Sequence, residues 1–218
     1  MKKYYIGLIV SIFLFSISFV KANPVESDLR LIGKVIYLDP GHGGTDPGAV
    51  YKDIYEKDIT LSICKKLKDI LEREGAIVYM TRYDDYDLST TTYNRKRNDL
   101  NNRSKIINES MADLYISIHL NSVSSTTWRG AQVFYDDVNE RNKTIAEILQ
   151  SNLNKERDIK EIDDILMNRK IKIPGVLIEA GFLSNPNDRY LLKNSDYQYK
   201  LCSKIKDGII KYFEFDNI

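Results

Sequence analysis

Short apolar runs alternate with longer amphipathic segments along the chain. The runs predict five strands, KVIYLD (34–39), AIVYMT (76–81), LYISIH (114–119), GAQVFY (130–135) and PGVLIEAG (174–181). Apolar residues at helical spacing predict four helices, over 53–74, over a segment carrying Leu100, Ile106, Ile107 and Met111, over 140–153 and over 196–213. Strands that alternate with helices are typical of βαβ units. We therefore predict a single-domain α/β fold with a twisted, mostly parallel sheet flanked by helices on both faces.

The first 22 residues have a different pattern from the rest. Two lysines precede an uncharged stretch over residues 4–20, and Ala22 follows at a plausible cleavage position. This layout predicts a secretory signal peptide. An uncleaved N-terminal membrane anchor is the alternative, because the stretch is close to the roughly 17–25 residues that span a bilayer. In both cases we expect export across the cytoplasmic membrane, with 23–30 a polar linker and 31–218 the folded domain.

Composition narrows the classes of partner. The chain has 218 residues, 43% of them hydrophobic, and a formal net charge of +1. This length and hydrophobic content are enough to bury one core. The net charge is too small to attract nucleic acid, so we expect no nucleic-acid partner. Two cysteines in an exported protein allow a disulfide. However, Cys64 and Cys202 each lie in an apolar helical pattern, and we interpret them as buried core residues.

A glycine-rich loop, GHGGTD at 41–46, follows the first predicted strand. It could be a simple tight turn. A phosphate-binding loop would need GK followed by Ser or Thr, and a dinucleotide site would need glycine where Asp46 stands. The loop also carries His42, one of only two histidines in the chain. We infer that the loop presents this side chain.

The second histidine lies in a similar place. His119 ends the third predicted strand, Glu179 lies near the end of the last one, and Glu56 lies early in the first helix. Any one of them alone is more often structural, since a glutamate favours a helix N-terminus whatever its function. Together they lie at the carboxyl edge of the sheet, where open α/β folds bind ligands. Two imidazoles and one carboxylate are a common catalytic zinc set, and the other carboxylate would serve as a general base.

Longer motifs match a known family. They are LDPGHGGTDPGA, the EKD of IYEKD, TRYDD, ADLYISIHLNS and PGVLIEAGFLSNPND. From Lys34 to Phe213 the chain resembles the zinc-dependent N-acetylmuramoyl-L-alanine amidases of the Amidase_3 type, and it is most similar to the CwlD-type sporulation enzymes. The resemblance implies one Zn²⁺ per chain. Its metal ligands would be His42, Glu56 and His119, and the catalytic glutamate would be Glu179.

The resemblance also implies a reaction and a setting. The expected reaction is hydrolysis of the amide between the lactyl group of N-acetylmuramic acid and L-alanine, on peptidoglycan glycan strands and their stem peptides. A CwlD-type role would be modification of the spore cortex, with muramic-δ-lactam formation needed for germination. Because a net charge of +1 gives little attraction to an anionic wall, we also expect an accessory or anchoring protein to hold the domain near its polymer.

Two other functions stay open at this point. A zinc carboxypeptidase-like peptide hydrolase would need an arginine to clamp the terminal carboxylate, and Arg82 and Arg103 are candidates for that clamp. A non-catalytic wall-binding module would need none of the four site residues for hydrolysis. The presence of all four argues against the binding module.

Overall fold

The computed structural model describes residues 29–216, apart from 164 and 166. The predicted signal peptide or anchor at 1–22 and most of the predicted linker at 23–30 lie outside the described residues. Within the described part, no helix is long and apolar enough to cross a membrane.

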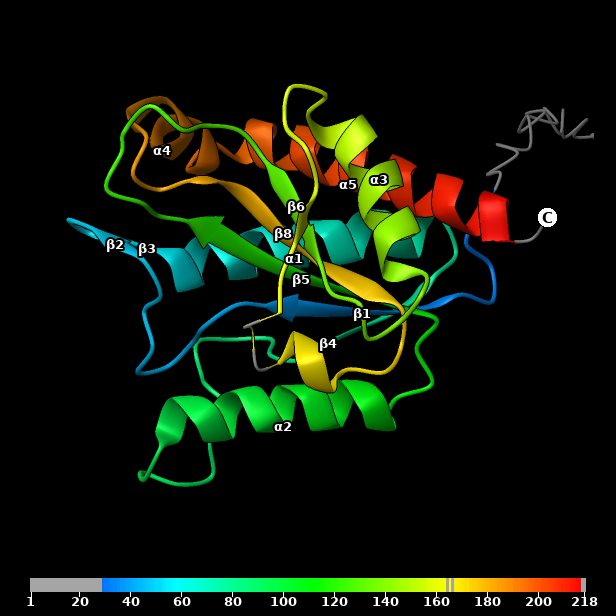
Figure 1. Cartoon of the computed structure of the whole chain (residues 1–218), viewed down its shortest axis with the longest axis horizontal. Coiled ribbons are helices and arrows are strands. Elements are labelled where there is room, and N and C mark those ends of the chain that lie inside the picture. The colour runs from blue at the N-terminus through cyan, green and yellow to red at the C-terminus, as the bar shows by residue number, and fades with distance from the viewer. Residues whose placement is uncertain (1–28, 164, 166, 217–218) are drawn as a thin grey trace, which may run out of the picture.

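One six-stranded sheet forms the centre of the domain (Figure 1). The strands lie in the order β4-β1-β5-β8-β6-β7. Every pairing is parallel except that between β6 and β8, so the predicted mostly parallel sheet is confirmed. The strand bounds are β1 (Val35–Pro40), β4 (Ile77–Met80), β5 (Leu114–Asn121), β6 (Gln132–Tyr135), β7 (Lys160–Glu161) and β8 (Gly175–Phe182).

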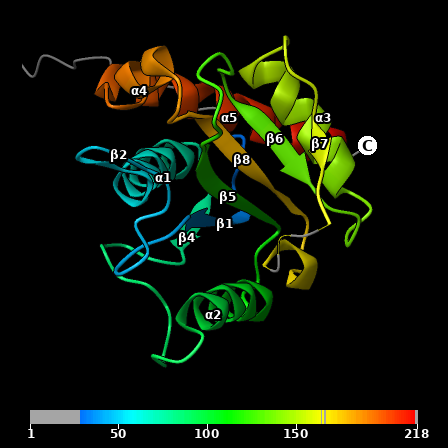
Figure 2. The same cartoon turned by 60° about the vertical axis from the view of Figure 1, so that its left-hand side comes forward.

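Helices cover both faces of this sheet, as predicted. Figure 2 shows α1, α3 and α5 on one face and α2 across the other. The bounds are α1 (Glu56–Arg73), α2 (Arg95–Glu109), α3 (Asn142–Leu153), α4 (Pro186–Leu192) and α5 (Ser195–Asp216), and a short 3-10 turn, η1 (Asn168–Lys170), lies near α2.

The burial of the central strands on both faces explains why their sequences are nearly continuous apolar runs. All residues of β5 are buried except His119 and Asn121, and all of β8 except Glu179. Strands covered on both faces need apolar residues at successive positions, not only at alternate ones. The largest core lies between the sheet and α1, α3 and α5, and it includes Cys64 and Cys202, which are buried and free.

The first helix starts later than predicted. A small hairpin of β2 (Val50–Tyr51) and β3 (Ile54–Tyr55) occupies the segment before it, and Lys52 takes a left-handed φ of 55° in the turn. The helix therefore begins at Glu56 and not at residue 53. As a result, Glu56 stands in the first turn, close to the carboxyl edge of the sheet.

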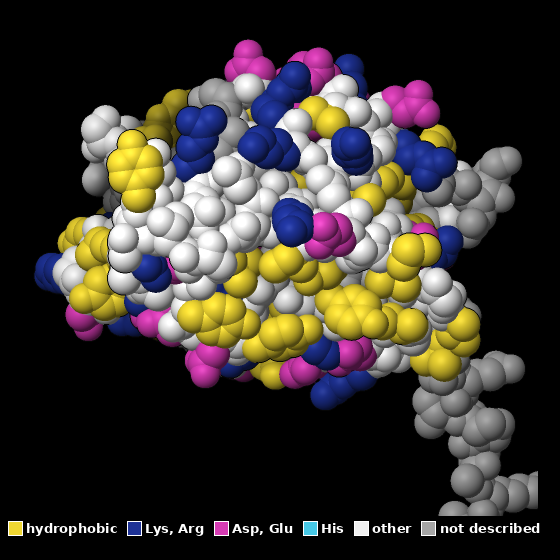
Figure 3. Space-filling view, turned by 90° about the horizontal axis from the view of Figure 1, so that it is seen from below, with side chains coloured by type: hydrophobic (Ala, Val, Ile, Leu, Met, Phe, Trp, Pro, Cys, Tyr) yellow, Lys and Arg dark blue, Asp and Glu magenta, His cyan; other side chains and the backbone are white. Residues whose placement is uncertain are grey.

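The second helix differs most from its prediction. Met111 was expected on its buried stripe, but α2 ends at Glu109 and Met111 is 88% exposed. Only Ile107 of the predicted apolar residues is fully buried, while Asp99 and Arg103 are buried as well. Figure 3 shows the molecule from below the view of Figure 1, the side on which α2 lies. This face carries Lys and Arg side chains over one part and a band of hydrophobic side chains over another.

A short helix, α4, was not predicted. Pro186 stands in its first turn, and the side chain of Asn185 accepts hydrogen bonds from the backbone N–H groups of Asn187 and Asp188. An asparagine cap followed by proline is a standard start signal for a helix. The start of α4 could therefore have been predicted from the sequence NPND at 185–188.

Candidate active site

The loop after β1 brings His42 to the carboxyl edge of the sheet. His42 takes a left-handed φ of 63°, and the backbone N–H of Gly41 donates to the carbonyl of Ile118 on β5. Two glycines of this loop are required by close approach. A Cβ on Gly41 would lie 2.4 Å from the ring of His119, and a Cβ on Gly48 would lie 2.6 Å from a carboxylate oxygen of Glu56.

Two buried arginines hold this loop in place. Arg82 donates to the carbonyls of Pro40 and Gly41. Arg103 donates to the carbonyls of Pro40 and His42 and forms an ion pair with the carboxylate of Asp39. The suggestion that either arginine clamps a substrate carboxylate is wrong, because Arg82 is 0% and Arg103 1% exposed. Their donors already bind the protein's own backbone and carboxylates.

Three predicted site residues meet at one point. The Nε2 atom of His42 lies 3.2 Å and the Nδ1 atom of His119 lies 3.1 Å from Oε1 of Glu56. One ligand atom from each of the three lies within 4.8 Å of the others, which is close enough to bind a single metal ion. The three side chains come from the β1–β2 loop, the first residue of α1 and the end of β5.

Neighbouring groups fix these side chains. The Nδ1 atom of His42 donates to Oδ2 of Asp46 at 2.9 Å, which orients the ring so that Nε2 faces the cluster. The carboxylate of Glu56 accepts from the backbone N–H groups of Ala49 and Leu120. A carboxylate held by backbone donors and an imidazole oriented by a second carboxylate are the usual surroundings of metal ligands. The residues present therefore fit a metal ion.

The pKa values follow from the same contacts. Burial lowers the pKa of His42, but hydrogen bonds to Asp46 and Glu56 outweigh it and raise the pKa to about 9. Burial raises the pKa of Glu56, yet its hydrogen bonds to the two histidines hold that pKa well below the usual range. The hydrogen bond from His42 likewise lowers the pKa of Asp46 to about 2. The cluster thus favours positive charge beside an ionised Glu56.

Glu179 lies beside this cluster and outside it. Its residue on β8 is in register with His119 on β5, and it lines a cavity of about 180 Å³ together with both histidines. The Oε2 atom of Glu179 is buried and has no hydrogen-bond partner among the described residues. Burial, followed by the nearby charge of Glu56, raises the pKa of Glu179 to about 8. A carboxyl group in this state readily binds and releases a proton near neutral pH.

The structure shows contacts around the site that the sequence analysis did not predict. Asp46 lay inside a quoted motif, and its spacing of four residues from His42 was the only signal of the contact. Nothing in the sequence pattern placed Arg82 or Arg103 behind the loop, since both contacts join segments about 40 to 60 residues apart.

An α/β sheet that brings two histidines and a glutamate together at its carboxyl edge has the arrangement that metal-dependent hydrolases use, and comparisons with known proteins define the family. The sequence model described as N-acetylmuramoyl-L-alanine amidase matches residues 36–211. The chain belongs to this family, which confirms both the resemblance drawn from its motifs and the predicted enzyme class.

Individual relatives agree with the family. The chain is 44% identical to the germination-specific N-acetylmuramoyl-L-alanine amidase of Bacillus subtilis (strain 168), over 95% of this chain and 92% of the relative. It is 37% identical to the probable cell wall amidase LytH of Staphylococcus aureus, over 88% of this chain and 62% of that protein. The solved structure of the CwlD amidase from Clostridioides difficile, in complex with the GerS lipoprotein, superposes with a TM-score of 0.79 at 39% identity, covering 84% of this chain and 99% of that one.

Proposed function

We propose that this protein is a zinc-dependent amidase that hydrolyses the amide between the lactyl group of N-acetylmuramic acid and L-alanine of the stem peptide. One observation carries the proposal. Two imidazole nitrogens and a carboxylate oxygen lie within 4.8 Å of one another at the carboxyl edge of the sheet, in a chain that matches the amidase family over nearly all of its described length.

In this proposal, His42, Glu56 and His119 hold one zinc ion per chain, through the atoms that already face one another. When bound, zinc supplies Lewis-acid chemistry, which polarises the scissile carbonyl and lowers the pKa of water to about 7. Asp46 keeps His42 in the tautomer that ligation requires. The backbone N–H groups that bind Glu56 limit its movement, so the ligand set is preorganised.

Glu179 acts as the general base. Glu179 lines the same cavity as the two histidines, and its buried Oε2 atom has no hydrogen-bond partner among the described residues. It takes a proton from the water that attacks the carbonyl carbon and then gives this proton to the nitrogen of L-alanine as the amide breaks. The positive charge of His42 opposes burial and increases the ionised fraction of Glu179, because an opposite charge favours the charged form.

The biological setting we propose is the spore cortex. A relative at 44% identity is named germination-specific, which supports a role in cortex modification and muramic-δ-lactam formation for germination. The lipoprotein bound to the CwlD amidase supports an accessory or anchoring partner for this chain. Relatives named as wall amidases support export to the wall or cortex side of the membrane, with residues 1–22 as the signal peptide or anchor.

Mass spectrometry of digested peptidoglycan tests the reaction. The purified protein is incubated with purified muropeptides, with zinc and with a chelator. We expect zinc-dependent release of peptides that begin with L-alanine, and muramic acid with a free lactyl carboxylate. Loss of residues from the peptide's C-terminus would support the carboxypeptidase instead. Binding without any hydrolysis would support the wall-binding module.

A further inference from the structure

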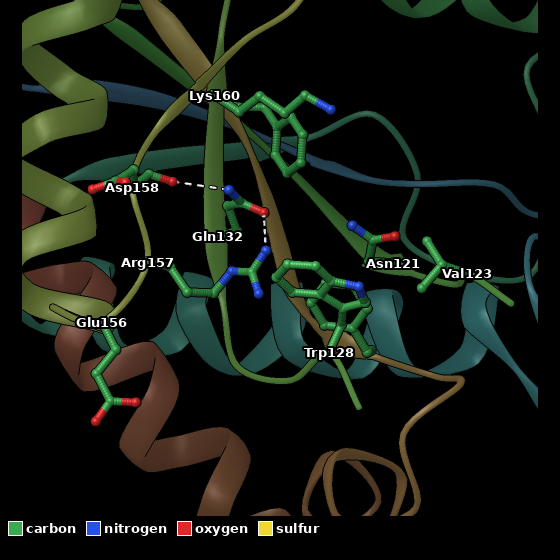
Figure 4. A pocket seen from close by; sticks show the side chains of 10 residues that line it. Asn121, Val123, Trp128, Gln132, Glu156, Arg157, Asp158 and Lys160 are labelled. Atoms are coloured by element: carbon green, nitrogen blue, oxygen red, sulfur yellow. Dashed lines mark hydrogen bonds between the residues drawn. The ribbon is translucent and has the colours of Figure 1, made fainter. Parts of the chain in front are cut away.

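Exposed apolar side chains gather at more than one place on the described domain. One place is a groove of about 440 Å³ that includes Trp128 and Phe182 (Figure 4). This groove adjoins the candidate metal site, because Gln132 in its wall is in register with Glu179 on the neighbouring strand. Another place is the outermost strand of the sheet, β4, and no step of the proposed hydrolysis uses it.

One face of β4 is open on the side of the sheet where α2 lies. Tyr79 pairs with Tyr37 of β1, and the centres of their rings are 6.1 Å apart. Tyr37 is buried in a cluster with residues of α2, whereas Tyr79 and Ile77 are 48% and 51% exposed. The alternate residues of the strand, Val78 and Met80, are buried in the main core. The strand is therefore covered on one face and uncovered on the other.

Exposed side chains continue beyond both ends of β4. Before the strand, a Cβ on Gly75 would lie 2.9 Å from the side chain of Ile32, so Ile32 packs beside this turn. After the strand, the hydroxyl of Tyr83 accepts from the N–H of Met80, and the hydroxyl of Tyr86 accepts from the N–H of Tyr83. We call this set the β4 strip, and its members are Ile32, Ile77, Tyr79, Tyr83 and Tyr86, all exposed by 41% or more. A band of hydrophobic side chains is visible on this face in Figure 3.

The edge of β4 is protected against pairing with another strand. The backbone N–H groups of Ile77 and Thr81 donate to β1 and the residue before it. The N–H of Met80 is instead bound by the hydroxyl of Tyr83. A strand edge whose donor is already bound is a poor template for a further strand. The uncovered face of the strip, and not its edge, is therefore the surface available for contact.

Charged residues lie at the ends of the strip and not along it. Arg82 is the one charged residue in the sequence of β4 and the three residues after it, and its side chain is buried. Asp84 and Asp85 follow at one end, where Lys57 pairs with Asp85, and Arg30 lies at the other end. Because charges of both signs flank the strip, apolar burial and not net charge would carry a contact here.

The sequence before the described residues indicates what this face meets. The uncharged stretch at residues 4–20, predicted to be a signal peptide or anchor, ends nine residues before Leu29. Nine residues span at most about 30 Å. Leu29 lies at the start of the strip, since its carbonyl accepts from the N–H of Ile32. In the anchored form, the strip therefore begins within this distance of the bilayer. Tyrosine is also enriched where a membrane meets water, because its ring is apolar and its hydroxyl is polar.

We propose that the β4 strip rests on the outer surface of the cytoplasmic membrane, with its isoleucines and tyrosine rings in the headgroup region. The strands of the sheet then run along the membrane surface. The candidate metal site, at the carboxyl edge of these strands, faces along the surface and not into lipid. The anchored form has two attachments to the membrane, and the cleaved form keeps only the strip and binds more weakly. The proposal concerns location and does not depend on the proposed hydrolysis.

Flotation with lipid vesicles tests the strip in the chain that starts at residue 23, which keeps every described strand and helix. The vesicles are phosphatidylcholine alone, and phosphatidylcholine mixed with phosphatidylglycerol. We expect the protein to float with both, and to do so in about 0.5 M NaCl, because apolar contacts are not screened by salt. The double variant Ile77→Thr, Tyr79→Thr keeps β-forming residues and should lower the bound fraction at limiting lipid by at least about 10-fold. Tyr190→Thr, at an exposed position on α4 outside the strip, should bind normally.

Footprinting of the full chain provides a second measurement that needs no variant. The full chain is reconstituted in the same vesicles and exposed to hydroxyl radicals, and oxidation is located by mass spectrometry. We expect Tyr79 and Tyr83 to lose reactivity relative to the lipid-free chain from residue 23. Tyr93 and Tyr190, which are more exposed and lie outside the strip, should keep theirs and serve as internal controls.

The proposal is overturned if the wild type does not float with either kind of vesicle, which would leave the strip to a protein partner. It is also overturned if the double variant, folded by circular dichroism, floats as well as the wild type, or if Tyr79 and Tyr83 are oxidised equally with and without lipid. A lipid-free dimer in analytical ultracentrifugation that the double variant abolishes would assign the strip to a second copy of the chain instead.

Discussion

Replacing Arg103 with methionine should lower the free energy of unfolding by about 3–5 kcal/mol, because it leaves a buried carboxylate without its cation. Arg103 and Asp39 are each 1% exposed, and Nη1 of the arginine lies 2.8 Å from Oδ1 of the aspartate. Nε of Arg103 also lies 2.8 Å from Oδ2 of Asp99. Asp39 keeps hydrogen bonds from Thr81 and Ser117 after the replacement, so we expect the lower end of the range.

The stability difference between the wild type and Arg103→Met should depend on pH in a predictable direction. Burial raises the pKa of Asp39, but Arg103 and the hydroxyl donors outweigh it and hold the pKa below its usual value. A depressed folded-state pKa stabilises the protein above the unfolded pKa of about 3.9, and this stabilisation is lost as the pH falls through the folded pKa. Without Arg103, burial raises that pKa above the unfolded value, so the variant gains stability as Asp39 takes up a proton. The difference between the two proteins should therefore shrink from pH 7 to pH 4.

Urea denaturation measures both effects. With a typical slope of about 2 kcal/mol per molar urea, a loss of about 3–4 kcal/mol lowers the midpoint by roughly 1.5–2 M. Arg97→Met is the control, because Arg97 is an exposed residue of the same helix and methionine has a similar helix propensity to arginine. Equal midpoints for the two variants, or a gap that widens as the pH falls, would refute the reasoning.

Three other replacements probe the site. Glu179→Gln should keep zinc in elemental analysis and lose hydrolysis by at least about 10²-fold, as expected for a general base; loss of zinc would place Glu179 among the ligands. Gly41→Ala should weaken zinc binding measured by chelator competition, since the new Cβ would lie 2.4 Å from the ring of His119, whereas Gly33→Ala, with open space around it, should bind zinc normally. Asp46→Asn should reduce zinc affinity by about 10- to 100-fold in the same competition, because it removes the acceptor that orients the imidazole, and unchanged affinity would mean that this contact does not orient the ligand.

The strands were predictable because their surroundings are simple. β5 and β8 are covered on both faces, so their sequences are continuous apolar runs bounded by polar residues. The second helix was not predictable in the same way. It is anchored on its buried side largely by Asp99 and Arg103 in ion pairs, so a search for an apolar stripe extended it wrongly to Met111.

The site was predictable in outline for a topological reason. Parallel strands bring their carboxyl ends to one edge, so His119 and Glu179 had to lie close together once both were placed on such strands. Which glutamate sits with the imidazoles could not be derived from spacing alone. It depends on the β2–β3 hairpin, which starts α1 at Glu56 and points that side chain at the histidines.

Zinc content tests the central claim most directly. Wild-type protein and the His119→Ala variant are purified in parallel, saturated with zinc, desalted and measured by elemental analysis. Truncation of His119 at the sheet edge should leave the fold intact, which circular dichroism checks. The account predicts one zinc per chain in the wild type and little in the variant. A variant that retains zinc as well as the wild type, or a wild type that binds none, would contradict it.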